Sequence, residues 1–300
     1  MGLEISGKKT GAYYESLLLI TTLTWSMSFI WSKTVTNTGM DSGVYLFLRY
    51  TLAFLLLLPF SAKKFRRMTA RQFKTGVMMG CIVFGGMIFQ TCGIALTTPS
   101  NSSFITTAYV VIAPFTTWLL MKKKPQKHIY AAVGLCLVGI YILNMKPGEI
   151  ISLNLGNALT LLGAVGWAFQ LTYTSVAGEY MDPILLSALN FGVTGLGGLL
   201  YSAVSGGLAS ITAQQLSGAW QAIVLAAVFP TIVANVIQVY AQHNVDANKA
   251  AVIYTLEAVF ATFISVLMGF ESWSLSVIAG GGIIFCAVLV AQLGGRRKNV

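Results

Sequence analysis

The stretch from Gly43 to Ser61 reads GVYLFLRYTLAFLLLLPFS, and it decides what kind of chain this is. It holds a single charged residue, Arg49, and the basic cluster KKFRR follows it at positions 63–67. About 20 apolar residues in a helix span the hydrocarbon core of a bilayer, which is about 30 Å thick. The stretch therefore predicts a membrane-spanning helix that ends at a charged membrane surface.

The rest of the chain repeats this pattern. Hydrophobic residues make up 56% of the 300 residues and charged residues 9%, whereas a soluble domain has about 25% charged residues. This composition predicts an all-α polytopic membrane protein in a single membrane domain, and it excludes most soluble enzyme chemistry. We predict ten transmembrane helices, at residues 15–36, 43–61, 73–95, 102–121, 128–144, 155–177, 183–204, 217–240, 248–268 and 274–293.

Basic residues set the expected orientation, because Lys and Arg accumulate on the cytoplasmic side of membrane proteins. If the N-terminus is cytoplasmic, 16 of the 19 Lys and Arg residues fall on that side and only Lys146 falls outside. Both termini are then expected in the cytoplasm. The 16 residues are Lys8, Lys9, Lys63, Lys64, Arg66, Arg67, Arg71, Lys74, Lys122, Lys123, Lys124, Lys127, Lys249, Arg296, Arg297 and Lys298. Since they flank membrane helices, the net charge of +10 does not indicate nucleic-acid binding.

A faint internal repeat appears when residue 25 is aligned with residue 167. Trp25, Ser28 and Ser32 then match Trp167, Gln170 and Thr174, and both sets follow the i, i+3, i+7 spacing of one helix face. The halves are residues 1–148 and 149–300, each with five helices. Because five is odd, the second half must cross the bilayer in the opposite sense. Inverted repeats are typical of secondary transporters, whose binding site lies between the halves.

Three stretches resemble the drug/metabolite transporter superfamily, EamA type: WSMSFIWSK at 25–33, LRYTLAFLLLLP at 48–59 and LEAVF at 256–260. The GFE turn at 269–271 is similar too, and the likeness covers residues 15–293. The resemblance implies a ten-helix, two-repeat carrier in a bacterial inner membrane. The sequence departs from the family at Ala258, where relatives often have Pro. Since Pro114 occupies the rough repeat equivalent, a helix break is expected in one half only.

Glu257 is the most conspicuous candidate site residue. It lies near the centre of its predicted helix, where a carboxylate facing lipid would cost at least ~2.5–3.5 kcal/mol. It must therefore face protein or water, either as a ligand for substrate or protons or as a hydrogen-bonding group between helices. Arg49 and Lys33 lie in predicted helices toward the outer side. Either could take part in gating or charge pairing, Arg49 with Glu257 for example, or extend toward the membrane surface.

The remaining candidates form polar and aromatic stripes. Asn235, Gln238 and Gln242 follow i, i+3, i+7 spacing, and Tyr254 lies one turn before Glu257. Such a lining suits amino acids, aromatic metabolites or amphipathic drugs better than phosphates, which need several cations. Single Asn or Gln residues can equally join helices. The predicted substrate-binding set is Trp25, Ser28, Trp167, Gln170, Asn235, Gln238, Tyr254 and Glu257.

These features predict a secondary transporter rather than an enzyme. We expect alternating access, with efflux of amino acids or related compounds as the direction that the resemblance favours. The alternatives are a carrier for vitamins or for phosphorylated or nucleotide-linked cargo, and a non-transport intramembrane protein. No nucleotide-binding or hydrolase motif is present, and the four cysteines lie in apolar segments. We therefore expect no cofactor, metal or disulfide, and a monomer or weak homodimer whose partners are the bilayer and a small-molecule substrate.

Overall fold

The computed structural model describes residues 11–122, 124–143, 154–242, 244–245 and 247–293, and every regular element in these ranges is a helix. The elements are α1 (Gly11–Asn37), α2 (Ser42–Phe65), α3 (Ala70–Leu96), α4 (Pro99–Thr106), α5 (Tyr109–Met121), α6 (Lys127–Leu143), α7 (Leu155–Ala177), α8 (Pro183–Ser205), α9 (Ala213–Ala226), the π-helical turn η1 (Ala227–Val233), α10 (Ala234–Gln242), α11 (Ala247–Leu267) and α12 (Leu275–Leu293).

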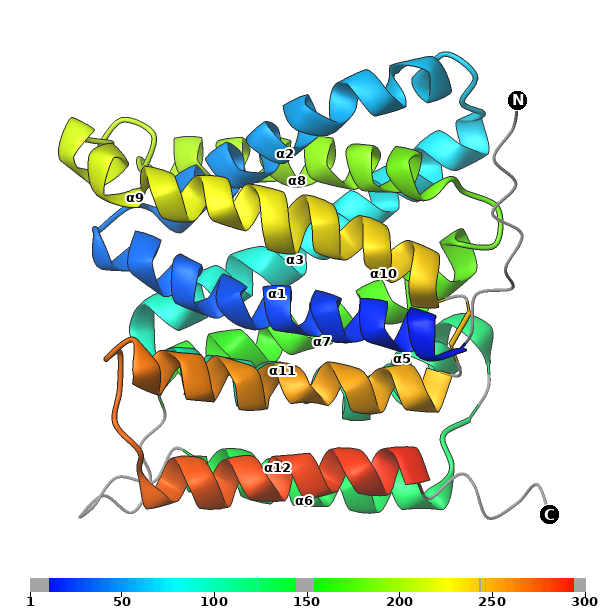
Figure 1. Cartoon of the computed structure of the whole chain (residues 1–300), viewed down its shortest axis with the longest axis vertical. Coiled ribbons are helices and arrows are strands. Elements are labelled where there is room, and N and C mark those ends of the chain that lie inside the picture. Colours follow the sequence, from blue (N-terminus) through cyan, green and yellow to red (C-terminus); the bar gives the residue numbers. More distant parts are fainter. Residues whose placement is uncertain (1–10, 123, 144–153, 243, 246, 294–300) are drawn as a thin grey trace.

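The described helices form a stack of ten rods, because α4 continues into α5, and α9 continues through η1 into α10. Successive rods run in opposite directions, so α1 begins and α12 ends on the same side of the stack (Figure 1). Five rods are long and apolar enough to cross a membrane: α2, α3, α4–α5, α8 and α9–α10. Shorter apolar stretches lie in α6, α11 and α12, while α1 and α7 carry the polar side chains described below.

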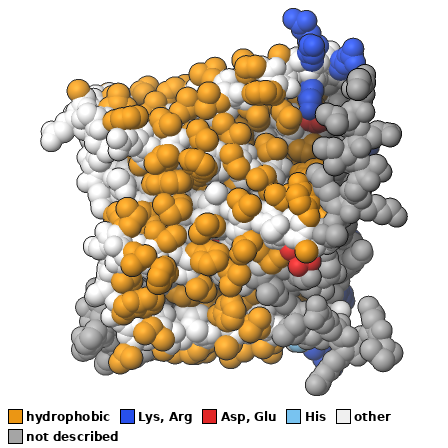
Figure 2. Space-filling view, in the orientation of Figure 1, with side chains coloured by type: hydrophobic (Ala, Val, Ile, Leu, Met, Phe, Trp, Pro, Cys, Tyr) orange, Lys and Arg blue, Asp and Glu red, His pale blue; other side chains and the backbone are white. Residues whose placement is uncertain are grey.

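Large hydrophobic side chains cover much of the outer surface of the protein. Large hydrophobic side chains such as Phe60, Leu200 and Val204 are exposed, and Figure 2 shows hydrophobic side chains spread across the face of the stack. Buried polar side chains, among them Thr21, Thr22 and Ser26, lie inside instead. An apolar exterior around a partly polar interior matches a protein whose surrounding solvent is lipid.

Two clusters of buried apolar side chains lie on either side of the molecular centre. One is formed mainly by α2, α3, α8 and α9, and the other mainly by α5, α6, α11 and α12. Helix α2 packs on α8 at one end of the stack, and α6 packs on α12 at the other (Figure 1). Between them α3 packs on α7, and α1 packs on α9, α10 and α11. At one crossing of α3 and α7 a Cβ atom on Gly93 would lie 2.7 Å from the carbonyl oxygen of Gly156. Only glycine permits that approach. Trp167 packs against both clusters.

Two predicted helices are interrupted. The predicted helix at 102–121 is divided into α4 and α5, and near Thr107 and Ala108 the backbone hydrogen bonds tighten to i−3 spacing. The counterpart α11 continues without interruption from Ala247 to Leu267. A break in one half only was the expectation, although Pro114 itself lies inside α5. The break lies almost two turns before that proline.

The interruption at η1 was not predicted, and Pro230 explains it. Proline has no backbone N–H, so the carbonyl of Ala226, four residues earlier, loses its helical donor. The Thr231 hydroxyl donates to that carbonyl at 2.8 Å instead. Asn235 Nδ2 donates to the carbonyl oxygens of Pro230 and Thr231, at 3.1 and 2.8 Å. Side chains therefore add hydrogen bonds to the carbonyl groups of the interrupted segment.

Apart from Lys33 and Arg49, the described basic residues lie at one side of the stack. Figure 2 shows Lys and Arg side chains at the right edge, where α2 ends in Figure 1. Lys64 there forms an ion pair with Asp182, the N-cap of α8, at 2.6 Å. Seven basic residues used to assign the orientation lie outside the described residues: Lys8, Lys9, Lys123, Lys146, Arg296, Arg297 and Lys298.

Candidate functional site

A central cavity lies between the two apolar clusters and contains about 800 Å³ of empty space, part of it open to solvent. All eight predicted substrate-binding residues line it: Trp25, Ser28, Trp167, Gln170, Asn235, Gln238, Tyr254 and Glu257. They come from α1, α7, α10 and α11, so both halves of the chain contribute to one space.

Sequence reasoning missed several lining residues. They are Phe29, Ser32, Tyr50, Val83, Met87, Gln90, Thr91, Ile94, Thr106, Tyr109, Leu171 and Pro230. Arg49, which was predicted for gating or charge pairing, also lines the cavity. Gln90 could have been found, since it is a polar side chain within the apolar stretch 73–95. Tyr109 could not, because its direction depends on the interruption between α4 and α5.

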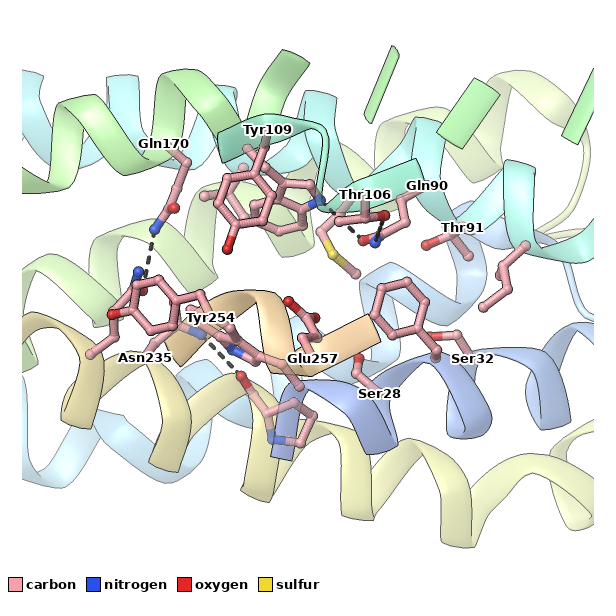
Figure 3. A pocket seen from close by; sticks show the side chains of 18 of the residues that line it. Ser28, Ser32, Gln90, Thr91, Thr106, Tyr109, Gln170, Asn235, Tyr254 and Glu257 are labelled. Atoms are coloured by element: carbon pink, nitrogen blue, oxygen red, sulfur yellow. Dashed lines mark hydrogen bonds between the residues drawn. The ribbon is translucent and has the colours of Figure 1, made fainter. Parts of the chain in front are cut away.

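A hydrogen-bonded chain of side chains joins three helices along one wall. Trp167 Nε1 donates to Gln90 Oε1 at 3.2 Å, and Gln90 Nε2 donates to the Thr106 hydroxyl at 2.9 Å. Figure 3 shows this pair beside Tyr109. Because Gln90 has bonds on both its oxygen and its nitrogen, its amide is fixed in orientation. The side chains of this wall therefore hold one another in place without a bound ligand.

The second amide group lies at the opposite end of Figure 3. Gln170 Nε2 donates to the Thr174 hydroxyl at 3.0 Å and to Gln238 Oε1 at 3.4 Å. The matched stripes of the sequence repeat thus have different roles: Trp25, Ser28 and Ser32 all line the cavity, whereas Thr174 supports Gln170 from behind. Asn235 is bound to the η1 backbone, as described above.

Glu257 extends from α11 into the cavity, and its side chain is 6% exposed. Its backbone carbonyl accepts a hydrogen bond from the Ser26 hydroxyl at 2.9 Å, which fixes α11 against α1. No side chain in the described ranges forms a hydrogen bond or an ion pair with its carboxyl group. The backbone at Glu257 is therefore held, while its acid group is left free.

Tyr109 lies across the cavity from Glu257, and its hydroxyl also faces the space between them (Figure 3). That hydroxyl is buried, and no partner for it exists among the described residues. The rings of Trp25 and Tyr254 lie 5.3 Å apart, centroid to centroid, and are further parts of the lining. An acid, an unpartnered hydroxyl and two aromatic rings thus face one space.

Arg49 is held quite differently. Its side chain is 3% exposed, its Nε donates to the Thr231 hydroxyl at 2.8 Å and its Nη1 donates to the Tyr45 hydroxyl at 3.1 Å. The guanidinium carbon also lies 5.8 and 5.4 Å from the ring centroids of Tyr45 and Tyr50. Thus Arg49 neither extends outward nor forms an ion pair with Glu257. It fastens α2 to η1.

Lys33 does not reach the cavity. Its Nζ donates to the carbonyl oxygens of Ile94, Ala95 and Thr97, at 3.0, 3.1 and 2.9 Å. These groups form the C-terminal end of α3, where a cation is favourable because the last carbonyls lack helical donors. Lys33 therefore fastens α1 to the end of α3, on the side away from the described basic cluster.

Among the described residues no three His, Cys, Asp or Glu side chains come together in a group that could hold a metal ion. Glu257 is the one acid among the lining residues of the cavity, and Arg49 is the one cation there. The cavity is thus equipped for hydrogen bonding, aromatic contact and one charge of each sign.

Comparison with known proteins agrees with this architecture. The EamA-like transporter family matches residues 13–145 and again residues 154–292. Two proteins of Archaeoglobus fulgidus, each described as an uncharacterized transporter, are similar over most of the chain. One is 28% identical over 94% of this chain and 86% of its own length. The other is 23% identical over 86% of this chain and 89% of its own length.

A solved crystal structure of a protein superposes with a TM-score of 0.65 at 17% sequence identity. It covers 96% of this chain and 99% of its own, so the likeness extends over the whole fold. Apolar rods around a cavity lined by aromatic, aliphatic and polar side chains are typical of a multi-pass membrane transporter. The double match to one family adds that the chain belongs to the EamA-like transporter family, of the drug/metabolite transporter superfamily.

Proposed function

We propose that the protein is a secondary transporter that moves small organic metabolites across a bacterial inner membrane by alternating access. The cargo class we propose is amino acids or related compounds, and the direction is efflux. The observation that carries the proposal is the cavity, whose aromatic and neutral polar lining comes from both halves of the chain. A lining of this kind selects organic molecules by shape and by a few hydrogen bonds.

The helix pairings support two inverted repeats, residues 1–148 and 149–300, within one membrane domain. Under the exchange of halves α1 corresponds to α7, and α3 to α9–α10. The pairing of α3 with α7 then corresponds to that of α9–α10 with α1, and both are present. Likewise α7 packs on α4 and α5 as α1 packs on α11. Such a paired arrangement allows one half to rock against the other around a shared site.

The alternative readings receive less support from the cavity. Phosphorylated or nucleotide-linked cargo calls for several cations, and Arg49 alone is available among the lining residues. Vitamins are tested as cargo in the flux assay described below. Enzyme chemistry calls for converging catalytic groups, and Glu257 has no second acid, His or Cys beside it in the lining.

A flux assay with a filled cavity tests the proposal. The protein is reconstituted in liposomes, and counterflow of labelled amino acids, vitamins and sugar phosphates is measured. Ser28→Leu places three further carbon atoms in the cavity and should abolish the flux seen with wild type. Ser217→Leu makes the same change on the exposed surface of α9 and should not. Equal flux in both variants, or no flux of any compound by wild type, would reject the proposal.

The proposed orientation places both termini in the cytoplasm. In a variant whose four native cysteines are replaced by Ala, a cysteine at the exposed position Ser272 should react with an impermeant thiol reagent added outside intact cells. A cysteine at Lys124, exposed on the opposite side of the stack, should not react. Labelling at Lys124 alone would reverse the orientation and leave the cavity assay unaffected.

A further inference from the structure

From the contacts of Glu257 and Tyr109 we infer that the cavity binds a protonated amine of the cargo, with both side chains as direct ligands. This inference rests on the proposed function and deepens it, because it names the chemical group that the site recognises. It also assigns a role to Tyr109, which lies outside the predicted substrate-binding set.

Glu257 is a buried acid whose carboxyl group forms no hydrogen bond or ion pair with a described side chain. A buried carboxyl group is normally hydrogen-bonded, and a buried charge is normally paired, because an isolated charge in an apolar setting is costly. Glu257 has neither kind of partner within the described residues. Its own backbone is fixed by Ser26, so the free acid is not the result of a loosely held segment. The missing partner is a group that enters and leaves the cavity.

The hydroxyl of Tyr109 is buried and unpartnered, although leaving a buried hydroxyl unsatisfied costs about 1–3 kcal/mol. It faces the same space as the Glu257 carboxyl group from the opposite wall (Figure 3). A phenylalanine there would avoid that cost. The hydroxyl is explained if its oxygen accepts a hydrogen bond from the cargo.

A cationic group of the cargo fits these side chains better than an anionic or a neutral group does. An ammonium group has three donors, enough to donate one hydrogen bond to the Glu257 carboxylate and another to the Tyr109 oxygen. The neighbouring Trp25 and Tyr254 rings favour a cation near their faces, and they accept its apolar part as well. An anion would meet the acid unfavourably, and a neutral donor would leave the charge uncompensated.

Thermal unfolding of the purified protein tests the inference without requiring transport. The probes are primary amines from propylamine to 2-phenylethylamine, each paired with the alcohol of the same shape, such as 2-phenylethanol. Amines should raise the unfolding temperature of wild type in a saturable way, and the alcohols should not. Glu257→Gln should weaken the apparent affinity for the amine roughly ten- to hundredfold, since a charge-assisted hydrogen bond is lost.

Tyr109→Phe gives a second readout that a merely structural role would not produce. It should weaken amine binding several-fold and leave the unfolding temperature of the empty protein equal to or above that of wild type, because the unsatisfied hydroxyl is gone. Matched controls are Tyr130→Phe and Glu179→Gln, both at exposed positions, which should bind amines as wild type does.

Three results would overturn the inference: no amine of the series stabilises wild type, the alcohols stabilise it equally, or Glu257→Gln binds amines with unchanged affinity. The outcome is distinguishable from failure of the proposed function. If amines bind as described and no compound crosses the liposome membrane, the amine site holds and transport is rejected. If flux occurs without any preference for amines, transport holds and the amine site is rejected.

Discussion

Arg49 and Glu257 are both ionisable side chains buried in apolar helices, and their surroundings differ. Arg49 has two hydroxyl partners and two aromatic rings around its guanidinium group. Glu257 has a fixed backbone and a carboxyl group with which no described side chain forms a hydrogen bond or an ion pair. A charge that serves the fold is expected to be satisfied by the fold. A charge left unsatisfied in a cavity indicates that its partner comes from outside.

The comparison predicts its largest effect for Arg49→Gln. This change removes the bonds to Thr231 and Tyr45 and should lower the free energy of unfolding by about 2–3 kcal/mol, the range for hydrogen bonds to a charged group. Glu257→Gln should leave the unfolding temperature of the empty protein within experimental error of wild type. Thermal unfolding in detergent measures both variants. The comparison fails if the two lose stability equally.

A change at Thr231 tests how η1 holds Arg49, because the Thr231 hydroxyl bonds to both Arg49 and the Ala226 carbonyl. Thr231→Val removes the hydroxyl group that accepts a hydrogen bond from Arg49 Nε and donates one to the Ala226 carbonyl, and it should cost about 1–2 kcal/mol. The companion change Pro230→Ala restores a backbone N–H four residues after Ala226. In the double variant the loss should therefore shrink, as a double-mutant cycle would reveal. Additive losses would mean that the hydroxyl does not replace the missing backbone bond.

Lys33 extends the comparison to a cation near the membrane boundary. It has three carbonyl partners and is half-buried, so it should behave like Arg49 with a smaller effect. Lys33→Met should cost about 1 kcal/mol, as expected for a cation at a helix C-terminus. Lys33→Arg should recover most of the loss. Amine binding in the cavity should be unchanged in both, and a clear loss of binding would place Lys33 in the site.

Breaking the Lys64–Asp182 ion pair should have the smallest effect on stability, because the two side chains are 34% and 44% exposed. Partial burial raises the pKa of the Asp182 carboxyl group, but hydrogen bonds from Lys64 and the backbone N–H groups of Leu185 and Ile184 outweigh it. The pKa is therefore lowered below its ordinary value. A lowered pKa stabilises the fold above the unfolded-state value of about 3.9.

That contribution is lost as the pH falls through the lowered pKa of the folded state. Asp182→Asn should cost about 0–1 kcal/mol at neutral pH, as is usual for exposed pairs. The difference from wild type should vanish in strongly acidic buffer. Unfolding temperatures of both proteins recorded from about pH 2 to about pH 7, a span that brackets the carboxyl pKa, measure this difference. A difference that grows in acid would contradict the stabilising role of the Asp182 carboxylate.

The sequence predicted the general architecture and much of the cavity for a physical reason. A bilayer demands long apolar helices, so a polar side chain at helical spacing within them is conspicuous. Trp25, Ser28, Trp167 and Gln170 could therefore be selected from their spacing alone. The predicted ends of most helices also agree with the structure to within a few residues.

What the sequence could not predict depends on backbone irregularity and on contacts between distant segments. The interruption at Pro230 was not predicted, and neither were the hydrogen bonds that Thr231 and Asn235 donate to carbonyl groups there. The position of Tyr109 follows from the break between α4 and α5, which has no proline at it. Arg49 was open to pairing with Glu257 or extending outward. Its actual partner, Thr231, is separated from it by 182 positions.

The most direct test of the central claim, that the protein leaves Glu257 for its cargo, is counterflow of labelled 2-phenylethylamine in liposomes. Equal amounts of wild type, Glu257→Gln and the surface control Glu179→Gln are reconstituted, and unfolding temperatures are checked beforehand. The account predicts saturable flux for wild type and the control, and at least roughly tenfold slower flux for Glu257→Gln at an unchanged unfolding temperature. Flux through Glu257→Gln equal to that of wild type would contradict it.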